Sequence, residues 1–238
     1  ESGGDPTEPG ENPTEPGKDP TNPGKDPTNP GKDPTNPGKD PLPEEPVDKL
    51  SITDVTIGKA SGTAQTGDNI SISVKSTGGV GAIKYRFSVK KDSSTVIRNY
   101  SSSRSAKWKP KKAGKYSITV YAKDEKGTVA TKTIAKYVVN NKLKVSSFKT
   151  SPSSKKARAG KKVKLTVKAS GGTKKYQYKF EYKKSGTKKI KRICNYSSKK
   201  TVIWRPKSSG KYTLYVYVKD KTTKRTVKKT INNFKIKK

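Results

Sequence analysis

The chain has 238 residues, of which 27% are hydrophobic, and it carries a formal net charge of +36 with no histidine. The length allows one or two domains, and no apolar run approaches the roughly 18 residues of a membrane-spanning helix, so no transmembrane segment is expected. The lack of histidine removes the commonest general base and the Ser–His and Cys–His nucleophile pairs, which argues against an enzyme.

The charge is distributed unevenly along the chain. Residues 1–49 contain twelve acidic side chains and five lysines, a net of −7. Residues 50–140 contain 17 basic and five acidic side chains, a net of +12, whereas residues 141–238 contain 33 and two, a net of +31. Self-repulsion at this density destabilises a compact state. This segment is therefore easier to explain if it normally lies against a polyanion.

The basic residues are mostly lysine, since only seven of the 55 are arginine. Lysine is a strongly hydrated point charge, whereas arginine matches the geometry of carboxylate or phosphate with a fork of donors. The balance favours attraction to diffuse negative charge over recognition of one shape.

The N-terminal segment is a proline-rich repeat. Thirteen of the 16 prolines lie in residues 1–49, and residues 5–39 are five seven-residue units, the last three of which read DPTNPGK. The units have no apolar position, which excludes a coiled coil, and two prolines in each unit exclude a helix. We expect a disordered, semi-stiff linker over residues 1–49. Its first residues, ESGGDPTEPG, resemble a mature N-terminus after signal removal or a cut inside a longer protein.

The rest of the chain contains two copies of one unit of about 95 residues. The stretch GKYSITVYAKD at residues 114–124 returns as GKYTLYVYVKD at residues 210–220, and in both an apolar residue alternates with a polar or outward one. Alternation with period two, flanked by turn-forming residues, predicts a half-buried strand. Further segments of this kind begin at Ile70, Ile83, Val163 and Tyr176.

About seven short strands in each copy, without helical periodicity, predict an all-β fold. We expect two tandem immunoglobulin-like antiparallel β-sandwiches, at residues 50–140 and 141–238, preceded by the disordered linker. Tyr116 and Tyr212 open the second-last strand of each copy and suit the hydrogen bond of a tyrosine corner. Two tryptophans that each stand two residues before a proline are expected to be core anchors: Trp108 and Trp204.

These residues resemble the triple-tyrosine, or three-Y, family of bacterial extracellular β-sandwich modules. The matching elements are Y-x-F at Tyr85 and Tyr178, N-Y-S at Tyr100 and Tyr196, W-K/R-P at Trp108 and Trp204, and the repeated GKY stretch. The resemblance covers both copies and implies a secreted or surface protein, with look-alike tandem copies in wall-associated proteins of Gram-positive bacteria, sometimes beside cell-wall hydrolases. The family has no catalytic residues to carry over. The second copy departs from the pattern, with KDKTTK in place of KDEKG and more lysine, which suggests specialisation for binding.

The outward side chains of two strands form the binding-site candidate. The strands KYRFSVKK and GKY correspond to strands C and F of an immunoglobulin-like sandwich, which are neighbours in one sheet. Each copy would then present an aromatic ring surrounded by cations. The cations would attract phosphate or carboxylate, and the ring would offer apolar contact to the face of a sugar. The candidate residues are Arg86, Lys90, Tyr121 and Lys123 in the first copy, and Lys175, Lys179, Lys183, Tyr215, Tyr217 and Lys219 in the second. The alternative for any single residue is that outward lysines keep the sheet soluble and guard its edges.

Other candidate sites have simpler structural explanations. Asp124 and Asp220 recur at a strand end, where capping of the backbone is favoured over a calcium site. Cys194 cannot form an internal disulfide, and a buried or edge thiol is favoured over a reactive one. The sequence has no Cys/His spacing for zinc, and we expect no metal or cofactor.

Three functions remain open at this stage. The first is a non-enzymatic secreted module that binds an anionic cell-envelope polymer or glycan, such as teichoic acid or peptidoglycan, and positions an attached or associated wall hydrolase. The second is a protein-interaction or dimerisation module of a sensor or surface protein. The third is nucleic-acid binding, for which we expect only non-specific affinity, since no basic recognition helix or RNA-binding motif is present.

Overall fold

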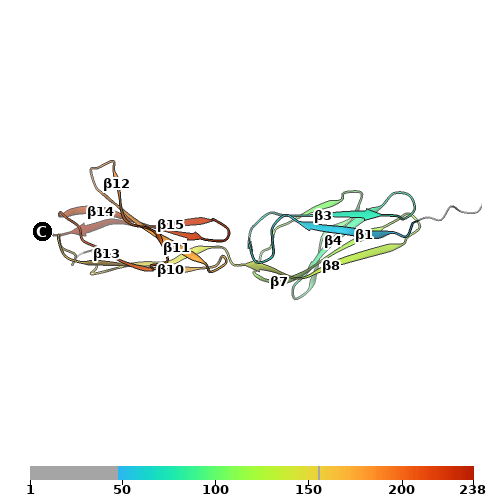
Figure 1. Ribbon diagram of the computed structural model, residues 1–238, viewed down its shortest axis with the longest axis horizontal. Coiled ribbons are helices and arrows are strands. Elements are labelled where there is room, and N and C mark those ends of the chain that lie inside the picture. Colours follow the sequence, from blue (N-terminus) through green and yellow to red (C-terminus); the bar gives the residue numbers. More distant parts are fainter. Residues whose placement is uncertain (1–47, 155) are drawn as a thin grey trace, which may run out of the picture. The chain divides into compact units, whose positions relative to one another are not determined.

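The computed structural model describes residues 48–154 and 156–238, and every regular element in this part of the chain is a β-strand (Figure 1). The all-β prediction is therefore confirmed. The predicted linker lies outside the described residues up to position 47. The described ranges include no helix that is long and apolar enough to cross a membrane.

The first eight strands form two sheets. The smaller sheet has the order β1-β3-β6 and consists of β1 (Ser51–Ile57), β3 (Ile70–Thr77) and β6 (Ser105–Trp108). The larger sheet has the order β2-β8-β7-β4-β5 and consists of β2 (Ala64–Gln65), β4 (Lys84–Lys90), β5 (Ser94–Ser101), β7 (Gly114–Lys123) and β8 (Val129–Asn140). All pairs are antiparallel except β2 with β8.

The remaining seven strands repeat this arrangement. One sheet has the order β13-β10-β9 and consists of β9 (Lys144–Ser151), β10 (Val163–Ser170) and β13 (Thr201–Trp204). The other has the order β12-β11-β14-β15 and consists of β11 (Tyr176–Lys184), β12 (Ile190–Ser197), β14 (Gly210–Asp220) and β15 (Thr226–Ile236). In both copies the KYRF/QYKF strand pairs with the GKY strand, as predicted.

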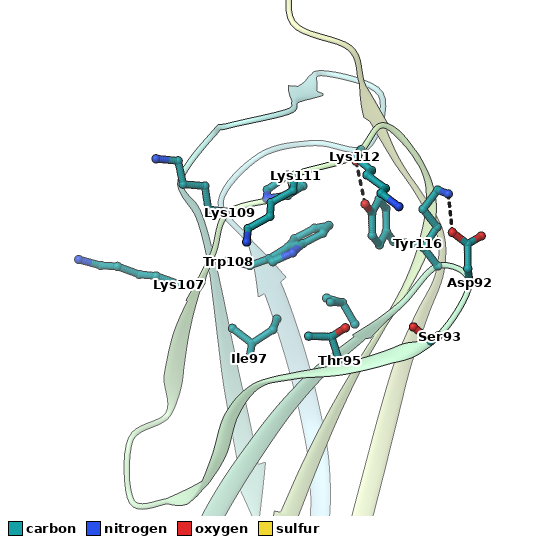
Figure 2. A pocket seen from close by; sticks show the side chains of 13 residues that line it. Asp92, Ser93, Thr95, Ile97, Lys107, Trp108, Lys109, Lys111, Lys112 and Tyr116 are labelled. Carbon is teal, nitrogen blue, oxygen red and sulfur yellow. Dashed lines mark hydrogen bonds and ion pairs between the residues drawn. The ribbon is translucent and has the colours of Figure 1, made fainter.

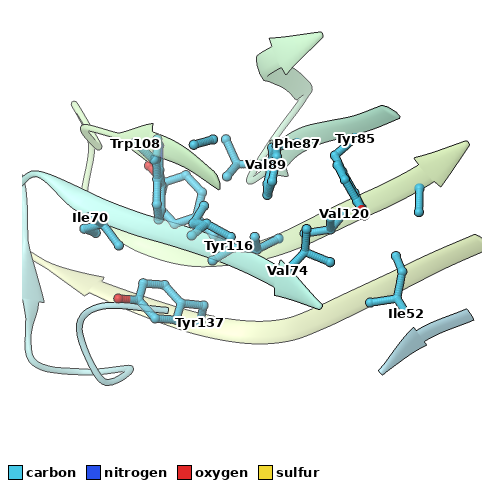
Figure 3. Packing of buried hydrophobic residues seen from close by; sticks show 14 of the residues in the cluster. Ile52, Ile70, Val74, Tyr85, Phe87, Val89, Trp108, Tyr116, Val120 and Tyr137 are labelled. Atoms are coloured by element: carbon cyan, nitrogen blue, oxygen red, sulfur yellow. The ribbon is translucent and has the colours of Figure 1, made fainter. Parts of the chain in front are cut away.

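Each copy has a hydrophobic core built from the inward residues of its alternating strands. Figure 3 shows the core of the first copy. The tryptophans are core residues, as predicted: Trp108 packs on Tyr116 with ring centroids 4.9 Å apart, and Trp204 packs on Tyr212 at 5.1 Å. The hydroxyl of Tyr116 donates to the Lys112 carbonyl, as that of Tyr212 does to the carbonyl four residues upstream, both at 2.7 Å. The tyrosine-corner prediction is thus confirmed in both copies.

The recurring aspartate joins two turns in each copy. The carboxylate of Asp124 accepts hydrogen bonds from the Thr128 amide at 2.7 Å and from the Val80 amide at 3.3 Å. The carboxylate of Asp220 accepts from the amide of Thr173 at 2.6 Å and from the two amides that follow Lys221, at 3.0 and 3.1 Å. These bonds confirm backbone capping. The second copy therefore keeps the predicted cap although the sequence of its turn is altered.

The altered turn also keeps a residue with left-handed backbone geometry. Gly127 has φ 89° in the first turn, and Lys224 has φ 58° in the second, each one residue before the carbonyl that closes the turn. A residue with a side chain is disfavoured in this region of φ and ψ, whereas glycine is not. The second turn thus carries a local conformational cost that the first avoids.

We propose that the boundary at residues 140 and 141 separates two independently folding domains. The buried hydrophobic residues fall into two clusters, one within residues 50–139 and the other within residues 143–236. Since each cluster is enclosed by its own strands, fragments 50–140 and 141–238 are each expected to unfold in one cooperative transition. Circular dichroism and amide NMR spectra of the two fragments check this. A fragment that becomes ordered only when joined to the other contradicts the proposed boundary.

The Asp220 cap predicts a loss of stability in acid. Burial raises the pKa of Asp220, but hydrogen bonds from Thr173, Thr223 and Thr222 outweigh burial and hold the pKa below its ordinary value. A carboxyl whose pKa is lowered by folding stabilises the protein above its unfolded pKa of about 4, and this contribution is lost as the pH falls through the folded value.

Asp220→Asn is therefore expected to lower the free energy of unfolding by about 1–3 kcal/mol at pH 7. The variant should also lose less of its free energy of unfolding than the parent chain when the pH falls. Urea unfolding of the whole chain at pH 7 and pH 3 measures both effects. Asp54→Asn is the control, because this carboxylate is exposed on β1. A variant that loses as much stability in acid as the parent chain contradicts the assigned role.

Candidate functional site

The predicted site residues lie mainly on the side of the larger sheet that faces away from the core. In β14 the residues Leu214, Val216 and Val218 are buried, whereas the intervening Tyr215 and Tyr217 are half-buried. In β11 Tyr178 and Phe180 are buried, whereas Lys179 between them is half-buried. The period-two prediction thus assigns these side chains to the correct face.

A cation and a tyrosine lie opposite each other at one equivalent position in both copies. Arg86 of β4 is in register with Tyr121 of β7, and Lys179 of β11 is in register with Tyr217 of β14. The Arg86 guanidinium lies 5.3 Å from the centre of the Tyr121 ring, and the Lys179 ammonium lies 4.3 Å from that of Tyr217. Both distances are within the range of a cation–π contact. The two copies therefore repeat one contact with different cations.

The second copy has more contacts of this kind. Tyr196 of the edge strand β12 receives two ammonium groups, that of Lys179 at 5.7 Å and that of Lys219 at 5.5 Å from its ring centre. Lys228 of β15 lies 5.6 Å from the ring centre of Tyr215. Four lysine–tyrosine contacts therefore converge on the β12-β11-β14-β15 sheet.

Tyr196 and Lys228 were not among the predicted site residues. Tyr196 belongs to the repeated N-Y-S motif, which was the available signal, but the pairing of β11 with β12 shifts register twice, on either side of Phe180. Such bulges break the alternation from which the facing of a side chain is derived. The position of Lys228 follows from its register with Tyr217, which depends on how the last strand pairs.

A carboxylate lies beside the central lysine of this face. The Lys179 ammonium is 2.9 Å from an oxygen of Glu181, and the side chains retain 22% and 15% exposure. The hydrogen bond to Glu181 raises the pKa of Lys179. The Tyr217 ring is thus covered by Lys179, which is itself paired with Glu181. The tyrosines of this face therefore contact lysines of the same copy and are not free rings that could stack on a ligand.

The other predicted residues lie farther from this centre. Lys90 and Lys183 stand four positions along their strands from Arg86 and Lys179, in register with Ser117 and Thr213, which is a distance of about 13 Å at the usual rise of a strand. Lys123 of β7 is in register with Lys84 of β4, at the other end of the sheet. Lys175 precedes β11 and is exposed in the turn. The predicted set is therefore spread along the face, and only the cation–tyrosine centre is in contact.

Cys194 lies on the edge strand β12 and is partly buried against the second core. Its thiol donates to the Asn195 carbonyl at 3.3 Å. This position agrees with the predicted edge thiol.

Comparison with known families gives one match. The sequence model of the Y_Y_Y domain matches residues 76–140, the part of the first copy that runs from the end of β3 through β8. The triple-tyrosine resemblance is thereby confirmed in the first copy. The second copy lies outside the matched residues. Curated protein sequences give no significant match.

Several solved structures are similar to the chain at low sequence identity. A C-terminal fragment of intimin, in complex with the intimin-binding domain of the translocated intimin receptor, has 18% identity over 76% of this chain and 64% of that chain, with a TM-score of 0.46. Fibronectin(III)-like modules of Clostridium thermocellum CbhA have 18% identity over 77% and 94%, with a TM-score of 0.30. The chicken CNTN1 FN1-FN3 domains have 12% identity over 80% and 68%, with a TM-score of 0.32.

The geometry around Lys179 predicts a titration effect. Burial raises the pKa of the Tyr217 phenol, and the negative charge of Glu181 adds to the rise against the opposite effect of Lys179. Glu181→Gln removes that charge and is expected to lower the pKa of Tyr217 toward the ordinary value of about 10. NMR titration of ring-labelled tyrosine measures it, with Tyr217→Phe to assign the signal. An unchanged pKa in Glu181→Gln, with Asp54→Asn as the control, contradicts the arrangement.

Proposed function

We propose that this chain is a non-enzymatic extracellular binding protein, a proposal supported by the match of residues 76–140 to the Y_Y_Y domain model. Domains of this family are typical of extracellular proteins. Its ligand is an anionic polymer of the cell envelope, such as teichoic acid or peptidoglycan, held by long-range attraction to the second copy. The proline-rich segment then acts as a spacer between the binding modules and an attached wall-acting partner.

This proposal rests on the observation that both carboxylates in residues 141–238 already have partners within this copy. Asp220 is fully buried and is occupied by backbone amides of its own turn and of a neighbouring turn. Glu181 is paired with Lys179. Neither carboxylate is left to neutralise the remaining cations of this copy, whose net charge is +31. An external polyanion removes the repulsion that this surface imposes on the fold.

The type of basic residue and the duplication support the same ligand. Lysine dominates over arginine by 48 to seven, which suits a flexible chain of charges more than a single planar group. Two linked weak sites also gain affinity through effective concentration when the ligand is a long polymer.

Two other functions are less well supported. A protein-interaction or dimerisation role would rest on an exposed apolar patch, whereas the exposed large hydrophobic residues of the described chain are four, spread over both copies: Val96, Val129, Ile190 and Ile203. Nucleic acid would bind non-specifically through charge alone. A protein-interaction role does not account for the difference in charge between the two copies, and nucleic-acid binding rests on that charge alone, without a basic recognition helix among the described residues.

A sedimentation assay with purified cell walls tests the proposal. Residues 50–238 are expected to bind walls strongly at low salt and to dissociate near 1 M salt, where the screening length is about 3 Å. Removal of teichoic acid should weaken binding, and deletion of residues 141–238 should weaken it more than deletion of residues 50–140. Binding that persists both in high salt and without teichoic acid contradicts the proposal and favours a partner recognised by shape.

A further inference from the structure

Both copies contain a cleft at the same place in the fold, away from the lysine–tyrosine face described above. In the first copy it lies between the β4–β5 hairpin and the loop after Trp108, and its volume is about 460 Å³. In the second copy it lies between the β11–β12 hairpin and the loop after Trp204, and its volume is about 330 Å³. Equivalent residues line both clefts, including a lysine at the end of the hairpin (Lys91, Lys184) and the corner tyrosine.

The first cleft has an aromatic floor and a lysine rim (Figure 2). The ammonium ends of Lys111 and Lys112 extend toward Trp108 and Tyr116, whereas those of Lys107 and Lys109 point away from the cleft. The loop that carries these lysines is fixed by the corner hydrogen bond, because the Tyr116 hydroxyl donates to the Lys112 carbonyl. The fold therefore holds two cations beside an apolar floor.

The clefts differ from the lysine–tyrosine face in how their cations are paired. Asp92 is the one acidic residue that lines the first cleft, and it forms an exposed ion pair with Lys91 at 2.8 Å. Among the described residues, no carboxylate lies within ion-pair distance of Lys111 or Lys112. These two ammonium groups are therefore available to an external anion.

The second cleft contains no acidic residue at all. The lysines that line it are Lys184, Lys189, Lys191 and Lys207. Lys184 donates to the Ser208 hydroxyl at 2.9 Å, and that hydroxyl is 3.1 Å from the hydroxyl of Tyr212. The lysine at the hairpin end is thus tied to the tyrosine corner instead of to a carboxylate, and the positive charge of this cleft is not offset from within.

We propose that each cleft binds a phosphate group carried by a polyol or a sugar. The ammonium groups surround the phosphate, and the carbon-bound face of the polyol or sugar packs against the aromatic floor. Lysine is the one cationic residue type among the described residues that line the two clefts, and it binds phosphate as a point charge, without the fixed planar geometry that the fork of arginine imposes. The volumes are in the range of small-molecule sites, about 300–1,000 Å³. The inference rests on the proposed function, since it assigns the repeating unit of the polymer to a defined subsite.

The test uses the whole chain and glycerol phosphate as the probe. The two tryptophans of the chain report on the two clefts, because Trp108 lines the first and Trp204 packs on Tyr182 and Tyr212, which line the second. Indole NMR signals are followed during titration at constant ionic strength. Glycerol and inorganic phosphate are titrated separately, so that the contributions of the floor and of the phosphate are distinguished.

Two pairs of variants separate a defined subsite from diffuse attraction. Asp92→Asn removes the acid of the first cleft. It is expected to raise the affinity of this cleft for glycerol phosphate several-fold, as measured from the Trp108 indole signal. Asp54→Asn changes the net charge by the same amount on β1 and should leave that affinity unchanged. The double variant Lys111→Ala with Lys112→Ala is expected to lower that affinity about tenfold. Its control is Lys75→Ala with Arg104→Ala, which removes two exposed cations of the same copy outside the cleft.

The outcomes distinguish this inference from the proposed function. Signals of both indoles that respond to glycerol phosphate more strongly than to inorganic phosphate, with effects confined to the cleft variants, support the clefts. Indole signals that do not respond, or control variants that change the affinity as much as the cleft variants do, overturn them. If wall binding nevertheless keeps its dependence on salt and teichoic acid, the proposed function stands and only the subsite is rejected.

Discussion

Repulsion among lysines is the constraint on which the second copy depends. A net charge of +31 is carried by 98 residues with two carboxylates, both of which are used inside the fold. The free energy that opposes this repulsion comes from burial of apolar surface, concentrated in a cluster in which Trp204 contacts Tyr182, Tyr212 and Phe234. The charged face and the aromatic core are therefore linked energetically, because the core keeps the charges together.

The same strands supply the core and the charged face. Every second residue of β11 and β14 packs inward, and the residues between them carry the cations and the tyrosines over which these cations lie. The corner tyrosines connect a third feature to these two, since each fixes the loop that forms one wall of a cleft. Core, face and cleft thus depend on one alternating pattern and one repeated hydrogen bond, and both recur in the second copy.

The sequence predicted what depends on local periodicity. Alternation assigned Lys179 and Tyr217 to one face, and the tryptophans, the corner tyrosines and the capping aspartates recur at equal places in both copies, which exposed their structural roles. Features that depend on chain pairing and loop shape were not predictable. Tyr196 joins the face across a bulged pair of strands. The clefts form where a hairpin meets a loop, and no periodicity reports how the side chains of Lys111 and Lys112 are directed.

Hydrogen exchange at two matched core amides tests the electrostatic account most directly. Val120 of β7 and Val216 of β14 are both fully buried at equivalent positions. The net charge of the copy around Val120 is +12, and that of the copy around Val216 is +31. If repulsion limits the stability of the second copy, protection of Val216 should rise with added salt, and at low salt with a soluble polyphosphate, more steeply than protection of Val120. Equal responses at the two amides, or no response at Val216, would contradict the claim that uncompensated charge governs this molecule.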